Sequence, residues 1–257
     1  QLEELSSDLS ARRRNELRTR LMQVIGRLRE TEARLDPIHQ PLSFFDPSDP
    51  RIVGKFIGLA LIAQPRVGLG DLEKFYGSGV YALYYEGDFQ QYQPIRATET
   101  PVYVGKADPA DGAATTPKQQ GTRLHGRLQD HARSIGKATN LNVENFVCRY
   151  LVVQSGWQTA AEAYLIDVFR PVWNNEIKLV YGIGKHGDSA KTRANKRSPW
   201  DTMHPGRAWA YSDPAMKDQV PLSELDNMLD AHFAEVPPFK DTAGVLERFF
   251  TSLRQID

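Results

Sequence analysis

Residues 79–85 read Gly-Val-Tyr-Ala-Leu-Tyr-Tyr and residues 101–105 read Pro-Val-Tyr-Val-Gly. β-Branched and aromatic residues bounded by glycine and proline are typical of short strands, so both stretches predict β-strands. A helical pattern follows at about 122–135, then a third strand at 146–153, then a second helix at about 159–169 that ends before Pro171. This order predicts an α+β fold in which a small sheet is flanked by helices.

The two ends of the chain have helical patterns of their own. Near the N-terminus a long basic helix ends before Pro37, and its apolar residues are spaced by four, three, four and seven: Leu17, Leu21, Val24, Leu28 and Leu35. Such a stripe packs either on its own domain or against a second copy of the helix. Two amphipathic helices are predicted near the C-terminus, at 222–233 and 244–253. We therefore expect an N-terminal helical arm (1–45), a core (66–210) and a C-terminal helical extension (211–257).

The overall composition is that of an ordinary globular protein, with 40% hydrophobic and 25% charged residues among 257. The only cysteine, Cys148, excludes an internal disulfide and fits a reducing compartment. The apolar stretch 56–63 is far shorter than the ~20 residues that a membrane-spanning helix needs. We expect a cytoplasmic protein without a membrane partner.

The net charge is zero, but the charges are unevenly distributed. Residues 118–210 contain 14 Lys/Arg and 7 Asp/Glu, whereas residues 211–257 contain 4 Lys/Arg and 9 Asp/Glu. A basic middle region is compatible with a phosphate-binding face. Ordinary variation in surface charge explains the same numbers, so the charges alone do not decide between a nucleic-acid-binding protein and another globular protein.

Glu162 lies on the apolar side of its predicted helix, within the arc formed by Ala161, Leu165, Ile166 and Phe169. A carboxylate there is costly unless it is paired, hydrogen-bonded or bound to a metal. The sequence from Thr159 to Glu162 also fits a capping box, in which the glutamate bonds back to the start of its own helix. The helix alone leaves a cap, an ion pair and a metal site open.

Arg127 and His131 share one face of the preceding helix, because they are four residues apart. His131 falls within the apolar stripe and Arg127 at its edge, with Arg123 further out, which suits side chains that line a cleft. A buried, hydrogen-bonded histidine and an arginine that lies along the surface fit equally well. Tyr81 and Tyr103 lie in the middle of the two strands, where most tyrosines are core residues.

A glycine-rich stretch at 182–187 matches the pattern Gly-x-Gly-x-x-Gly. A dinucleotide site would need an apolar helix directly afterwards, but the next residues are polar and basic. We therefore expect a basic loop and no nucleotide cofactor. The spacing of the histidines and of the single cysteine along the sequence matches no zinc-binding pattern.

Taken together, these pieces resemble the GIY-YIG nuclease superfamily. Gly79-Val80-Tyr81 is similar to its first signature triplet and Tyr103-Val104-Gly105 to its second, with valine in place of isoleucine in both. The remaining signature residues follow in the usual order: Arg127, His131, Glu162 and Asn174. Residues 200–210 also resemble the type II restriction enzymes of this superfamily, and the resemblance extends over residues 77–210.

The resemblance implies a metal-dependent DNA endonuclease. Glu162 would hold one divalent ion, Mg²⁺ or in substitution Mn²⁺, and Arg127 would contact the scissile phosphate. Tyr81 would be the general base, with Lys106 or His131 as the cation that favours its phenolate. Tyr103 and Asn174 would orient water, phosphate and metal ligands.

The restriction enzymes that this chain resembles cut CCGCGG, so we expect a GC-rich palindrome in double-stranded DNA. A palindrome implies a homodimer on DNA, with a larger assembly through residues 1–36 as a further option. Arginine and lysine read guanine in the major groove, and the candidate DNA-binding residues are Arg123, Lys185, Arg193, Lys196, Arg197 and Arg207. The alternatives are a homing or repair-type nicking nuclease of the same superfamily, and a DNA-binding protein built on an inactive nuclease core.

Overall fold

The computed structural model describes residues 10–35, 38, 45–184 and 196–254. Residues 46–256 form one compact unit, and helix α1 (Ala11–Leu35) belongs to a separate unit made by the first 45 residues. In the described parts of the chain, no helix is both long and apolar enough to cross a membrane.

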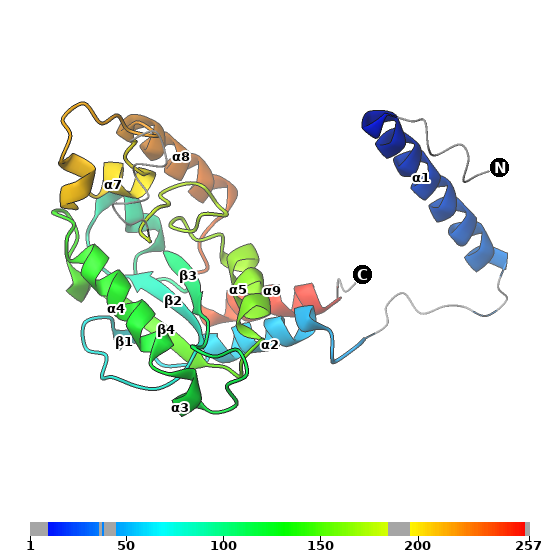
Figure 1. Ribbon diagram of the computed structural model, residues 1–257, viewed down its shortest axis with the longest axis horizontal. Coiled ribbons are helices and arrows are strands. Elements are labelled where there is room, and N and C mark those ends of the chain that lie inside the picture. The colour runs from blue at the N-terminus through cyan, green and yellow to red at the C-terminus, as the bar shows by residue number, and fades with distance from the viewer. Residues whose placement is uncertain (1–9, 36–37, 39–44, 185–195, 255–257) are drawn as a thin grey trace. The chain divides into compact units, whose positions relative to one another are not determined.

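The larger unit is built on a four-stranded antiparallel sheet (Figure 1). Its strands are β1 (Val67–Gly68), β2 (Gly79–Tyr85), β3 (Tyr103–Ala107) and β4 (Phe146–Val152), in the spatial order β1-β4-β2-β3. Strand β2 therefore pairs on both sides, and β3 lies at one edge of the sheet. The predicted α+β fold with a small sheet flanked by helices is confirmed.

Strand β2 passes through the centre of the unit, and all seven of its residues are buried. Successive side chains of a strand point to opposite faces, so the strand supplies two cores. Tyr81, Leu83 and Tyr85 join the core that contains α4 (Arg123–Ile135). Val80, Ala82 and Tyr84 join the core on the other face. This double burial explains why the strand is apolar throughout rather than alternating.

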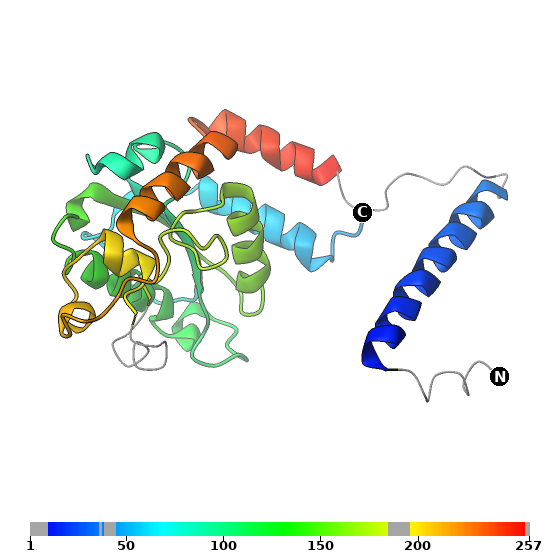
Figure 2. The same ribbon diagram turned by 90° about the horizontal axis from the view of Figure 1, so that it is seen from above.

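Three helices cover the second face of the sheet: α2 (Pro50–Ile62), α5 (Gln158–Phe169) and α9 (Thr242–Arg254). Helices α2 and α9 lie side by side in both views (Figures 1 and 2). Helix α2 was not predicted, because its glycines are unusual in a helix interior. They have a packing role instead: a Cβ atom on Gly54 would lie 2.6 Å from the backbone oxygen of Ala160 in α5.

The first face is completed by shorter elements. Helix α8 (Leu222–Glu235) packs on α7 (Pro199–Met203) and on the 3-10 helix η2 (Gln90–Ile95). The two C-terminal helices predicted from the sequence correspond to α8 and α9. The remaining short helices are α3 (Pro117–Gln120), η3 (Val143–Asn145) and η4 (Ala208–Tyr211).

Candidate active site

Two tyrosines lie next to each other where β2 pairs with the edge strand β3. Tyr81 is fully buried, and its ring centroid is 6.0 Å from that of Tyr103. Gly105 stands opposite Tyr81 in the register of the two strands. A Cβ atom on Gly105 would lie 2.5 Å from the Tyr81 hydroxyl oxygen. The glycine of the second triplet therefore leaves the space that the tyrosine of the first triplet occupies.

His131 lies against both tyrosine rings. Its Nε2 is 2.7 Å from the hydroxyl oxygen of Tyr81, and its ring centroid is 4.7 Å from that of Tyr103. Helix α4 brings it there because Leu124, Leu128 and Ile135 bury the same helix face. Burial, with a smaller contribution from the charge of Arg127, lowers the pKa of His131 to about 3. The imidazole is therefore neutral near pH 7.

The phenol of Tyr81 is protonated in this arrangement. Burial raises the pKa of Tyr81 well above its ordinary value, and the neighbouring phenol of Tyr103 raises it further. The guanidinium of Arg127 acts in the opposite direction and lowers the pKa of both tyrosines. Arg127 is thus a positive charge that favours the phenolate of Tyr81, and the imidazole of His131 carries no charge near pH 7.

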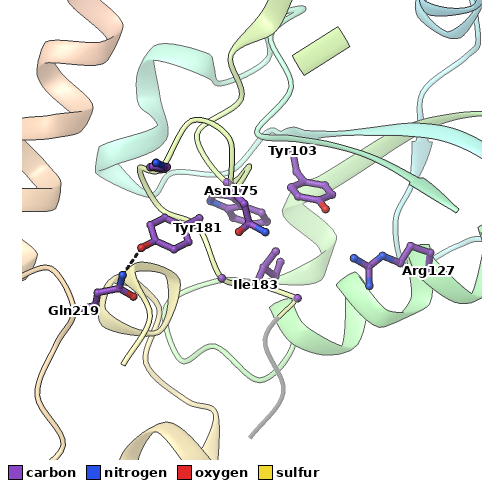
Figure 3. A pocket seen from close by; sticks show the side chains of 10 residues that line it. Tyr103, Arg127, Asn175, Tyr181, Ile183 and Gln219 are labelled. Atoms are coloured by element: carbon purple, nitrogen blue, oxygen red, sulfur yellow. Dashed lines mark hydrogen bonds between the residues drawn. The ribbon is translucent and has the colours of Figure 1, made fainter. Parts of the chain in front are cut away.

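Arg127 lies at the border of two neighbouring pockets. One has a volume of about 420 Å³, and Figure 3 shows Tyr103 and Arg127 pointing toward one another in it. The other, of about 490 Å³, is also lined by Lys106, Asp108 and Arg123. A guanidinium that is half-buried between two open, polar pockets is well placed to contact a phosphate group.

Glu162 reaches the same edge of the sheet from α5, on the other face. Burial raises the pKa of Glu162 to about 7; the charge of Lys106 lowers it, and Glu176 and Asp108 raise it. Lys106 donates hydrogen bonds to the Asp108 carboxylate at 2.6 and 2.7 Å.

The capping box that the sequence allowed at Thr159 is not formed. Helix α5 begins one residue earlier, at Gln158, and its N-cap, Trp157, makes no side-chain capping bond. The helix terminus therefore does not engage the carboxylate of Glu162.

Asn174 contacts the backbone of β3. Its side-chain oxygen accepts a hydrogen bond from the backbone N–H of Val104 at 3.0 Å, and its amide nitrogen donates to the Val104 carbonyl at 2.8 Å. The side chain thus pairs with the outer edge of β3 as a neighbouring strand would. It holds the strand that carries Tyr103 through both ends of its amide.

Arg207, expected to contact DNA, is instead buried. Its guanidinium pairs with Asp201 at 2.6 Å and donates hydrogen bonds to the backbone oxygens of Ile183 at 2.9 Å and Gly182 at 3.0 Å. It also lies 4.6 Å from the ring centroid of Trp200. The expectation that Arg207 reads bases is therefore corrected: it holds the backbone of residues 182–183, which line the 420 Å³ pocket.

The other candidate DNA-binding residues fall into three groups. Arg123 lines the 490 Å³ pocket beside Arg127, and Lys196 is exposed. Arg197 pairs with Asp218 at 2.6 Å and is partly buried. Two lie outside the described residues: Lys185 and Arg193.

Sequence reasoning missed the far wall of the 420 Å³ pocket. Tyr181 and Gln219 are hydrogen-bonded to each other there, beside Asn175 (Figure 3). Lys178 also lines this pocket. Tyr181 and Gln219 are 38 residues apart. No local pattern connects such distant positions, so only the folded chain reveals the pocket.

The residues present fit a magnesium site with few protein ligands. In the described part of the chain, no three histidine, cysteine, aspartate or glutamate side chains gather as a metal cluster. Mg²⁺ usually retains several waters and takes only one or two carboxylates beside substrate phosphates. A single, partly buried carboxylate with a raised pKa meets that requirement, because bound positive charge would favour its ionised form.

Comparison with known proteins adds one match. Residues 73–228, more than half of the chain, match the family described as the Eco29kI GIY-YIG domain. The matched segment contains strands β2, β3 and β4 and helices α4 and α5, and it ends within α8. No curated protein matches the chain.

Proposed function

The chain belongs to the Eco29kI GIY-YIG family of type II restriction endonucleases, and we propose that it cleaves both strands of a specific DNA site using one divalent metal ion per active site. The observation that carries this proposal is the meeting of Tyr81, His131 and Arg127 on one side of β3 with Glu162 on the other. Hydrolysis of a phosphodiester needs an activated water and neutralisation of the charge that develops on the phosphate.

In the proposed mechanism Tyr81 takes a proton from the attacking water and passes its own phenol proton to Nε2 of His131. The 2.7 Å contact and the neutral state of the imidazole support this transfer. A neutral imidazole accepts at one nitrogen only, so the proposal requires that Nδ1 carry the ring hydrogen. Arg127 favours the negative charge that Tyr81 carries during the transfer, and it binds the scissile phosphate.

We propose a different role for Lys106 than for His131. In the β2–β3 register it pairs with Val80, whereas Tyr81 pairs with Gly105. Neighbouring strand residues point to opposite faces, so Lys106 and Tyr81 lie on different sides of the sheet. We assign Lys106 to the Glu162 side, where its charge favours the ionised carboxylate and attracts the DNA backbone.

Glu162 would hold the divalent metal ion, Mg²⁺ or Mn²⁺. Such an ion, when bound, stabilises the negative charge on the phosphate and on the departing 3′ oxygen. Tyr103 would orient the phosphate through its hydroxyl, since it faces Arg127 across the pocket. Asn174 contributes by fixing the backbone of β3.

The proposed substrate is a GC-rich palindrome in double-stranded DNA, of the CCGCGG type. Two copies of the chain would then act on one site, with one active site on each strand. Arg123 and Lys196, with Lys185 and Arg193, remain the proposed DNA contacts, because arginine and lysine bind phosphates and read guanine in the major groove.

Cleavage of plasmid DNA tests this proposal. The purified protein is incubated with plasmid and Mg²⁺, with plasmid and EDTA, and as the Glu162→Ala variant. Discrete fragments that need both the metal and Glu162 support a restriction enzyme, and sequencing of their ends identifies the site. A nicked product alone would favour a homing or repair-type nuclease, and retarded DNA without cleavage would favour an inactive DNA-binding core.

A further inference from the structure

We propose that two copies of this chain associate through helix α1 as a parallel two-stranded coiled coil. Within the unit to which α1 belongs, its apolar residues are exposed: Leu21 at 59%, Val24 at 52% and Leu28 at 63%. Large apolar side chains at this exposure along one stripe are typical of a surface that is covered by a partner.

The spacing of the stripe favours a second helix as that partner. Leu17, Leu21, Val24 and Leu28 alternate by four and three residues, and Thr31 and Leu35 continue the same alternation. A strict alternation with an average of 3.5 residues is the seam of a left-handed coiled coil, whereas a helix on a globular core shows a wider stripe of period 3.6. The partner is therefore another helix with the same repeat.

The charges beside the seam indicate that the partner is a parallel copy. An arginine stands immediately before every second seam position of α1, at Arg13, Arg20, Arg27 and Arg34. In an antiparallel pair these flanking positions face each other, so arginine would meet arginine along the seam. In a parallel pair each faces the position five residues later in the other helix.

The parallel pairing places opposite charges together in the C-terminal half of the helix. Arg27 then faces the partner's Glu32, and the same contact recurs by symmetry. Arg20 faces the partner's Ile25, over which its apolar stem can lie.

The N-terminal turn of the helix contributes less to the pairing. Arg13 faces the partner's Arg18, so like charges repel there. The seam position that follows Arg13 is itself an arginine, Arg14, so the apolar part of the seam begins at Leu17. The association is therefore strongest over residues 21–35.

The inferred pairing is compatible with the way in which the C-terminal end of α1 continues into the rest of the chain. In a parallel pair the two C-terminal ends of α1 lie together, and each continues into its own nuclease unit. The seam extends over only about three heptads, a length at which a coiled coil is of modest stability. The inference does not depend on the proposed chemistry, because none of its residues belongs to the active site.

Cysteine cross-linking tests the pairing and its direction in the full-length protein. Cys148 is fully buried, so introduced thiols are the ones available for cross-linking. Leu17→Cys and Thr31→Cys occupy equivalent seam positions, 14 residues or about 21 Å apart along the helix. A parallel pair brings identical positions together, so each variant alone is expected to form a disulfide-linked dimer on a non-reducing gel. Thr19→Cys, on the opposite side of the helix, is the matched control and is expected to remain monomeric on the gel.

Two outcomes of the cross-linking would overturn the inference. Leu17→Cys and Leu35→Cys test the antiparallel alternative, because an antiparallel pair places the two alternating kinds of seam position beside each other. If these two variants form a disulfide only when they are mixed, the helices are antiparallel. If neither variant exceeds the Thr19→Cys control and sedimentation without DNA shows only monomer at tens of micromolar, α1 is not a pairing surface.

A charge exchange provides an independent measurement. Glu32→Arg is expected to weaken the dimer at least tenfold in sedimentation equilibrium, and Arg27→Glu in the same chain is expected to restore it. Thr19→Glu changes the charge on the far side of the helix and is expected to leave the dimer intact. Absence of rescue in the double variant would contradict the parallel pairing. DNA cleavage is measured separately, so failure of the nuclease proposal leaves these results unaffected.

Discussion

The hydroxyl oxygen of Tyr81 lies 2.7 Å from Nε2 of His131, and both side chains are buried. One is a phenol whose pKa is raised, and the other is an imidazole whose pKa is lowered to about 3. A proton that passes from the phenol to the imidazole leaves two opposite charges in contact rather than one isolated charge in the interior.

Tyr81→Phe is expected to reduce the rate of DNA cleavage by about 10²–10⁴-fold, the usual contribution of general base catalysis. DNA affinity, measured with Ca²⁺ in place of Mg²⁺, is expected to change little because the ring remains. Tyr85→Phe is the matched control: it lies on the same strand and the same face, and its hydroxyl accepts the Phe89 backbone N–H at 2.7 Å. Near-full cleavage by Tyr81→Phe would remove Tyr81 from the role of base.

The buried histidines make folding stability depend on pH. The pKa values of His131 and His204 are about 3 in the folded chain, below the ordinary value of 6.5. The unfolded chain binds protons that the folded chain excludes, so stability falls as the pH drops below 6.5. From pH 7 to pH 5 each histidine is expected to remove about 2 kcal/mol. Urea unfolding at both pH values measures this, and His204→Gln should remove about half of the contribution of these two histidines; an unchanged pH dependence would contradict it.

The carboxyl group of Glu162 makes folding stability depend on pH in the opposite direction. Its pKa of about 7 exceeds the ordinary value of 4.5, so without metal it stabilises the fold at low pH and loses this contribution as the pH rises through 7. In EDTA at pH 8, Glu162→Gln is expected to be more stable than the natural chain by about 1 kcal/mol, after allowance for its partial exposure. The difference should shrink as the pH falls from 7 and vanish near pH 4, below the ordinary pKa of 4.5. Added Mg²⁺ should stabilise only the natural chain, and thermal unfolding with and without Mg²⁺ checks both statements.

Gly105→Ala is expected to displace Tyr81, because the new methyl group would lie 2.5 Å from the phenol oxygen. Overpacking of this kind costs about 1–3 kcal/mol, and a misplaced catalytic group costs up to about 10²-fold in rate. Gly112→Ala is the control, since nothing lies within 4 Å of its Cβ position. Equal cleavage rates in the two variants would show that Tyr81 tolerates displacement.

Arg207 and Arg123 are expected to respond differently to substitution. Arg207→Met leaves Asp201 buried without its partner, which costs about 3–5 kcal/mol of stability. Arg123→Met should barely affect stability but should reduce the dependence of DNA affinity on salt by about one unit of slope, as for a phosphate contact. Unfolding curves and titrations at several salt concentrations measure both. If Arg207→Met changed the salt slope and left stability intact, Arg207 would be a DNA contact after all.

The fold and the centre of the site could be predicted because their signals are local. The strands of Tyr81 and Tyr103 follow from their composition and their glycines, and the helix of His131 follows from its apolar stripe. The family motif then connected these segments. The sheet, the helices beside it and the two C-terminal helices agree with the structure.

The roles of Asn174 and Arg207 could not be predicted, because they depend on contacts between distant parts of the chain. Arg207 meets carbonyl groups 24 and 25 residues away, and Asn174 meets Val104 at a separation of 70 residues. A buried arginine and an exposed one look the same in a basic segment. Helix α2 was missed for a related reason, since its glycines make sense only once α5 lies against them.

The closed outer side of β3 also bears on how the protein behaves in a crowded cell. A bare edge strand can recruit strands from other molecules and start aggregation. Here the side-chain amide of Asn174 is hydrogen-bonded to the backbone N–H and C=O of Val104. The backbone N–H of Trp173 donates to the Val102 carbonyl at 3.0 Å. The outer edge of the strand that carries Tyr103 is thereby less available for pairing with strands of other molecules, which lowers the tendency to aggregate at this edge of the sheet.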